Sequence, residues 1–246
     1  MKTPVLVSGI VLLALVGACG GYWAGPLLNQ RAEASGPAAP LAGSAAGQTV
    51  PPPSPSPSAT PSVPLIRKTP QPNPLEPLVS TDLEFRTRNF TVSSEVAGEV
   101  KLSIKVPAGW QLTPSKDKPS EVRFVDASGE RAIRIESALT PDKPVQQALQ
   151  DVLTNVQSSQ PYQNFVRPLF QGSGQVKDSD GQLRQVATLV YTYIPGATSR
   201  YVIVRFVATG DGDLATISMS VTGLPKEQKA LERILAEATS SVRIRD

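Results

Sequence analysis

The stretch VKLSIKVPAGWQL at residues 100–112 alternates apolar and polar side chains and then breaks at a proline, a glycine and a tryptophan. Val100, Leu102, Ile104 and Val106 fall on one face of an extended strand, because successive side chains of a strand point to opposite faces. The polar residues between them would face water. The stretch therefore predicts a strand with one packed and one solvated face, followed by a tight corner.

Strand and helix patterns recur through the rest of the chain. The segments with strand patterns lie at 83–92, 99–106, 121–126, 131–139, around 165–177, 182–194, 200–209 and 214–222. The last two are joined by the turn sequence GDGD, which predicts a hairpin. Residues 144–159 and 225–241 each open with proline and carry a single apolar stripe at helical spacing, which predicts two helices. Strands grouped around two helices indicate an α+β fold over 81–246, with an antiparallel sheet flanked by the helices.

The strand and Pro-x-Gly-Trp corner at 100–112 resemble the opening of PsbP/Mog1-like domains, and the order of elements over 81–246 is similar to theirs. The resemblance implies an α/β/α sandwich in which Trp110 lies in the core; the alternative is an exposed Trp110 that anchors a partner. Bacterial surface lipoproteins, notably of actinobacteria, carry such domains behind an anchor and a Pro/Ala-rich stalk. The family offers no shared catalytic residues and hosts binding and scaffolding roles.

The amino end, residues 1–29, predicts membrane attachment. A basic start, an apolar run at 5–18 and small residues after it are typical of a secretory signal peptide. Four residues resemble a bacterial lipobox: Val16, Gly17, Ala18 and Cys19. In that case the cysteine receives a diacylglycerol and becomes the new amino terminus; alternatively, the segment is kept as a single membrane-spanning helix. Both readings place the rest of the chain on the extracytoplasmic side of the cell membrane.

Residues 30–80 differ abruptly in composition from the segments on either side. Thirteen of the 24 prolines lie in residues 32–80, where Ala, Ser, Gly and Thr fill most of the remaining positions. Proline lacks the amide hydrogen that a helix requires, and the segment has little apolar surface to bury. We therefore predict a disordered linker with a reach of about 40 Å when fully flexible and up to about 150 Å when extended.

Composition limits the chemistry that the chain can perform. Histidine is absent and there is one cysteine, which excludes a histidine base or metal ligand and an internal disulfide. The formal net charge is only +3, with no concentrated basic cluster, so we expect no nucleic-acid partner and no cofactor. Ser115 and Lys118 satisfy Ser-x-x-Lys, but the companion motifs of penicillin-binding enzymes are missing.

Arginines recur on the predicted strand faces and are open to two interpretations. These residues are Arg86, Arg88, Arg123, Arg134, Arg200 and Arg205. They form either a basic strip for an anionic wall polymer or lipid headgroup, or the solvated side of a sheet paired with acids. We predict a membrane-anchored, non-catalytic binding or assembly module for a protein, lipid or cell-wall partner. The alternatives are an accessory subunit of a membrane complex, as in a photosystem, and an enzyme with an unrecognised site.

Overall fold

The computed structural model describes residues 66–94, 98–115, 118–137, 139, 142–210 and 212–245, all within one compact unit. The predicted anchor at 1–29, with Val16, Gly17, Ala18 and Cys19, lies outside the described residues, as does most of the predicted linker. None of the helices in the described part of the chain is long and apolar enough to cross a membrane.

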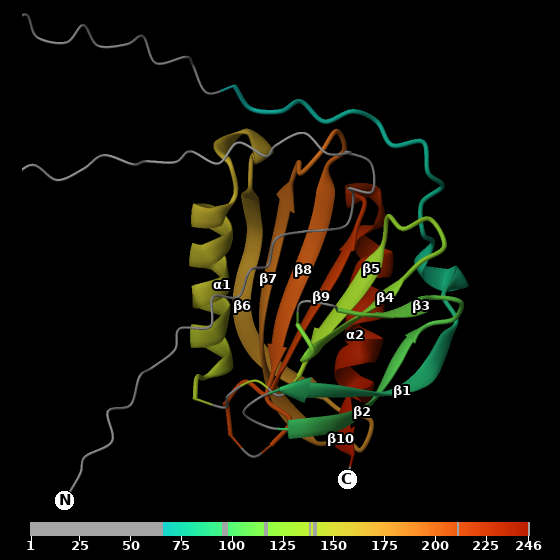
Figure 1. Cartoon of the computed structure of the whole chain (residues 1–246), viewed down its shortest axis with the longest axis vertical. Coiled ribbons are helices and arrows are strands. Elements are labelled where there is room, and N and C mark those ends of the chain that lie inside the picture. The colour runs from blue at the N-terminus through green and yellow to red at the C-terminus, as the bar shows by residue number, and fades with distance from the viewer. Residues whose placement is uncertain are drawn as a thin grey trace, which may run out of the picture. The chain divides into compact units, whose positions relative to one another are not determined.

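The described strands form two antiparallel sheets (Figure 1). The large sheet has the order β3-β4-β5-β9-β8-β7-β6 and the small sheet the order β1-β2-β10. The strands of the large sheet are β3 (Gln111–Pro114), β4 (Glu121–Val125), β5 (Ala132–Glu136), β6 (Arg167–Lys177), β7 (Leu183–Tyr193), β8 (Arg200–Val207) and β9 (Ile217–Gly223). The strands of the small sheet are β1 (Phe85–Ser94), β2 (Gly98–Pro107) and β10 (Arg243–Arg245). The predicted hairpin is confirmed, because β8 pairs with β9 antiparallel.

Two α-helices pack on opposite faces of the large sheet (Figure 1). They are α1 (Val145–Ser159), which contacts β6, β7 and β8, and α2 (Gln228–Ser241), which contacts β2, β8 and β9. Short 3-10 turns are η1 (Ser80–Asp82), η2 (Tyr162–Asn164) and η3 (Pro225–Glu227). The predicted α+β class, with an antiparallel sheet and two helices, is confirmed, and the layers are compatible with a sandwich.

Strand β8 shows why the fold has two cores. Its side chains alternate between the two helices: Val202, Val204 and Phe206 lie in the core under α1, whereas Ile203 and Val207 lie in the core under α2. A strand covered on both faces must be apolar at almost every position, and YVIVRFV meets this demand. The helices close the cores with the apolar stripes visible in the sequence.

Trp110 lies in the α2 core with 5% of its surface exposed, which confirms the core interpretation over an exposed anchor. The corner before it is a tight turn. The Trp110 amide donates to the Pro107 carbonyl at 3.3 Å, and Gly109 has φ +84°, a conformation that other residues rarely adopt. The turn thus directs the indole back onto the sheet.

The contacts of the compact unit begin before Ser80, where the predicted linker ends. Lys68 Nζ donates to Asn164 Oδ1 at 2.6 Å and to the Pro195 carbonyl at 2.7 Å. Further along, the Leu78 amide donates to Glu227 Oε1 at 3.1 Å. Residues 66–79 are therefore held by hydrogen bonds rather than by an apolar stripe, so no periodicity in the sequence reveals their position.

Candidate functional site

Charged side chains gather on the α1 side of the large sheet, on the adjacent strands β4 and β5. The register places like charges directly opposite each other: Glu121 faces Glu136, and Arg123 faces Arg134. Two other pairs relieve this repulsion: Glu121 Oε1 lies 3.2 Å from Arg134 Nε, diagonally across the two strands, and 3.1 Å from Arg123 Nε, two residues along its own strand. Lys118 Nζ lies 2.6 Å from Glu136 Oε1. We call these five residues the ionic cluster.

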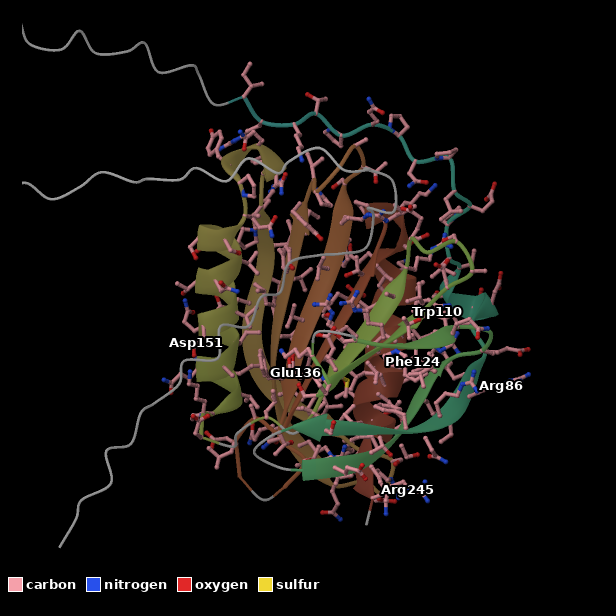
Figure 2. All side chains as sticks on the ribbon, viewed as in Figure 1. Arg86, Trp110, Phe124, Glu136, Asp151 and Arg245 are labelled. Atoms are coloured by element: carbon pink, nitrogen blue, oxygen red, sulfur yellow. The ribbon has the colours of Figure 1, made fainter. Side chains whose placement is uncertain are left out.

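Both carboxylates of the ionic cluster are shielded from water, with 5% of Glu121 and 7% of Glu136 exposed. Burial raises the pKa of Glu136; Lys118 opposes this effect, and the nearby charge of Glu121 adds to it. Figure 2 shows Glu136 over the large sheet. The neighbouring strand β9 adds hydroxyl groups, with Ser218 opposite Glu136. Chemically, the cluster can hold a proton on Glu136 at a higher pH than an ordinary glutamate would.

This raised pKa makes a pH dependence testable with Glu136→Gln. A carboxyl with a higher pKa when folded binds its proton more tightly in the folded state, so it destabilises the fold as pH rises above the ordinary value near 4.5. The variant should gain free energy of unfolding relative to the natural chain as pH increases from about 4 towards neutrality. Urea unfolding at a series of pH values measures this difference. The exposed Glu99→Gln is the control, and a variant that loses relative stability over this range would contradict the prediction.

The six sequence-predicted arginines do not form one strip, because alternation and strand order place them on different surfaces. Arg123 and Arg134 belong to the ionic cluster. Arg200 is largely buried and pairs with Glu130. Arg205 Nε donates to Thr188 Oγ1 at 3.0 Å. The interpretation of all six as one basic strip is therefore wrong, whereas Arg123, Arg134 and Arg200 pair with acids, as the alternative interpretation expects.

Arg86 and Arg88 alone of this set stay exposed, on β1, where they pair with Val106 and Ile104 on the face of the small sheet that turns towards the core. The opposite, outward face carries cations that the sequence did not single out, among them Arg245, which Figure 2 labels on the small sheet. The register defines an outward surface whose residues all carry a hydrogen-bond donor and no carboxylate. It consists of Thr87, Asn89, Thr91, Lys101, Ser103, Lys105, Arg243 and Arg245. We call this surface the donor face.

The sequence pattern could reveal the lysines of the donor face but not its arginines. Lys101 and Lys105 alternate with buried apolar residues in VKLSIKV, which correctly marked them as solvent-facing. Their cationic neighbours come from β10, a three-residue strand at the carboxyl end with no apolar alternation. Glu99, on the same side at the start of β2, marks where the acid-free surface ends.

A second exposed surface is apolar and lies where η2 leads into β6. Its exposed side chains include Tyr162, Phe165, Leu169 and Phe170. Phe165 has φ +47°, an uncommon conformation for a bulky residue. The Arg67 guanidinium stacks over the Phe165 ring at 4.3 Å from its centre. This corner gives the domain an apolar contact area at the open edge of the large sheet.

The Ser-x-x-Lys match of the sequence takes part in a structural contact. Lys118 of the Ser-x-x-Lys match is held by Glu136, as described above. In the turn at residues 178–181, burial acts to raise the pKa of Asp178, but the backbone amides of Gln182 and Asp180, together with Arg184, lower it on balance. Among the described residues, no group of three acidic, histidine or cysteine side chains is arranged to hold a metal ion.

A hollow of about 240 Å³ lies between residues 66–79 and the start of η3. Its lining has one charged side chain, Lys226, whose Nζ donates to the Leu75 carbonyl at 2.6 Å. A lining with a single cation supplies no acid–base pair. The hollow therefore brings none of the sequence-predicted groups together.

The fold and these surfaces define an antiparallel α+β domain with one cationic and one apolar exposed surface. Comparison with known protein families finds no family that matches the chain, and comparison with curated proteins finds no relative. The resemblance to PsbP/Mog1-like domains consequently rests on residues 100–112 and on the order of elements, and it stays a proposal.

Proposed function

We propose that the chain is a membrane-anchored, extracytoplasmic module whose PsbP/Mog1-like domain binds a partner without transforming it. The observation that carries this proposal is the donor face, an exposed surface with four cations and no carboxylate. Such a surface is suited to recognition of an anionic partner by charge. The apolar leader and proline-rich linker of the sequence support a location outside the cytoplasm.

The ionic cluster supports a structural interpretation of the most shielded carboxylates. Glu121 is contacted by two arginines, and Glu136 by Lys118. Buried charges are tolerated in proteins when they are paired in this way. Because cations of the domain itself already hold both carboxylates, a binding role of the exposed surfaces accounts for the arrangement better than catalysis at the cluster does.

The membrane tether is tested by the intact mass of the mature full chain and by Cys19→Ala. We expect a mature chain that begins at Cys19 and carries acyl groups, recovered with membranes and accessible to protease added outside the cell. The Cys19→Ala variant should lack the acyl mass and accumulate as a precursor, because no thiolate accepts the lipid. Ser44→Ala, in the linker, is the matched control and should be processed normally.

Two outcomes would separate the parts of this proposal. A membrane-bound chain that begins at Met1 without acyl groups overturns the lipoprotein interpretation and favours the uncleaved helix. A native chain recovered from the cytosol overturns the tether itself. Either result leaves the fold of the compact unit intact.

The apolar corner favours a second candidate function, an accessory subunit of a membrane complex. Exposed apolar patches often mark contact sites between proteins. Phe170, with 56% of its surface exposed, lies at the open edge strand β6, where it is accessible to a partner subunit. Pull-down of the full chain from native membranes distinguishes a stable subunit of a complex from a stand-alone surface protein.

A further inference from the structure

We propose that the donor face binds anionic phospholipid headgroups of the membrane that carries the chain. This inference deepens the proposed function and rests on its tether. It identifies the partner by its chemistry. The phosphate groups of lipid headgroups carry negative charge, offer oxygens that accept hydrogen bonds, and lie on a fluid surface.

The geometry of the donor face suits a surface better than a single bound ion. Thr91, Lys101 and Arg245 form one row across the three strands, and Asn89, Ser103 and Arg243 form the next. Neighbouring strands are about 4.8 Å apart, and residues on one face repeat about every 6.7 Å along a strand. The donors thus cover an area roughly 10 Å by 13 Å without enclosing a pocket. A spread of this kind contacts several headgroups at once.

The charges of the donor face are poorly compensated within the domain. Lys101 lies directly opposite Arg245, and like charges in that position destabilise a sheet. No ion pair joins either residue to a carboxylate in the described part of the chain. Arg243 contacts Asp180 at 2.6 Å, and Lys105 lies 3.9 Å from Glu237, but both pairs are solvent-exposed and therefore weak. An external anion relieves this repulsion.

The membrane is the favoured source of phosphate because the chain is held beside it. A tethered domain meets its own membrane at a high effective concentration, and a linker with a reach of about 40 Å allows it to return to the surface. Lipid anchors often act together with a polybasic patch.

The test uses the full chain, reconstituted through its own amino end into vesicles of phosphatidylcholine, with or without phosphatidylglycerol. Amine acylation followed by mass spectrometry reports the accessibility of each lysine. We expect labelling of Lys101 and Lys105 to fall several-fold in the anionic vesicles only, and to recover in high salt. Lys229, exposed on the first turn of α2, is the internal control and should label equally in both.

Charge-removal variants make the test quantitative. The double variant that carries Lys101→Gln and Arg245→Gln should associate with the anionic surface about 25-fold more weakly. Each cation near such a surface contributes about fivefold to the affinity, and the variant removes two of them. The protection of Lys105 reports this loss. Because Lys101 and Arg245 repel each other, the double variant should unfold at the same or a higher temperature than the natural chain. Loss of binding without loss of stability separates recognition from a structural role, and Lys229→Gln is the matched control.

Three outcomes would overturn the inference. Equal labelling of Lys101 and Lys105 in both kinds of vesicle shows that the donor face does not contact the lipid. Protection by soluble poly(glycerol phosphate), but not by anionic vesicles, assigns the surface to a polymer. A chain that remains in the supernatant with either lipid overturns the tether of the proposed function, and with it the premise of this inference.

Discussion

Replacing Glu227 by alanine is expected to lower the free energy of unfolding by about 3–5 kcal/mol, because it breaks a buried ion pair and removes one of the two carboxylates that compensate Arg131. Glu227 is fully buried, and its Oε1 accepts from Arg131 Nε at 2.8 Å and Arg131 Nη2 at 2.5 Å. The same carboxylate accepts from the backbone amides of Leu78 and Leu224. Burial acts to lower the pKa of Arg131, but its hydrogen bonds to Glu227 and Asp126 raise it on balance.

Urea unfolding of Glu227→Ala measures this loss, and limited proteolysis between residues 66 and 79 measures release of the segment held by Leu78. Glu232→Gln, which alters an exposed carboxylate of α2, is the matched control and should change stability little. Adding Arg131→Met should restore part of the stability, since the buried cation that lost one of its two carboxylates is then absent. A Glu227→Ala chain as stable as the control would contradict the assignment of this pair as a structural anchor.

Phe124→Ala should have an effect of similar size, about 3–5 kcal/mol, because it leaves a cavity in the α2 core. Phe124 is completely buried, and its ring meets the edge of the Phe90 ring with centroids 5.7 Å apart. That contact joins β4 of the large sheet to β1 of the small sheet. Removal of the ring therefore weakens the attachment of the small sheet, as well as the core, and should lower the unfolding temperature.

Phe170→Ala provides the matched control for Phe124→Ala, because it deletes the same side chain at an exposed position. Its ring lies over Gly172, and most of its surface already faces water. Thermal unfolding followed by circular dichroism should show a large shift for Phe124→Ala and a small one for Phe170→Ala. Equal shifts for the two variants would show that burial in the core is not what makes Phe124 important.

The sequence predicted the helices and strands in which burial imposes a regular spacing of apolar residues. The stripes of α1 and α2 and the apolar run of β8 follow directly from contact with the two cores. By contrast, β3 and β10 were missed because their side chains are exposed, so nothing in their composition distinguishes them from loops. Residues 66–79 were assigned to the linker because they show no apolar pattern. Hydrogen bonds from Lys68 and to Glu227 hold them in place instead.

The candidate site was less accessible to sequence reasoning because it depends on which strands become neighbours. Lys101 and Arg245 are 144 positions apart in the chain, yet the register places them opposite each other. Conversely, Arg123 and Arg205 both lie in the sequence VRFV, but Arg123 pairs with Glu121 whereas Arg205 donates to Thr188. Periodicity reports whether a side chain faces water, whereas pairing decides which other charges it meets there.

The position of β9 in the middle of the large sheet has a consequence for how the protein is made. Residues 132–136 pair with β4 on one side, but their neighbour on the other side is residues 218–222, near the end of the chain. Until the ribosome has delivered β9, β3 to β5 cannot join the remainder of the large sheet, and β2 still lacks β10. Closure of long loops slows the formation of such pairings. This late completion keeps the nascent polypeptide partly unfolded until its last strands have been synthesised.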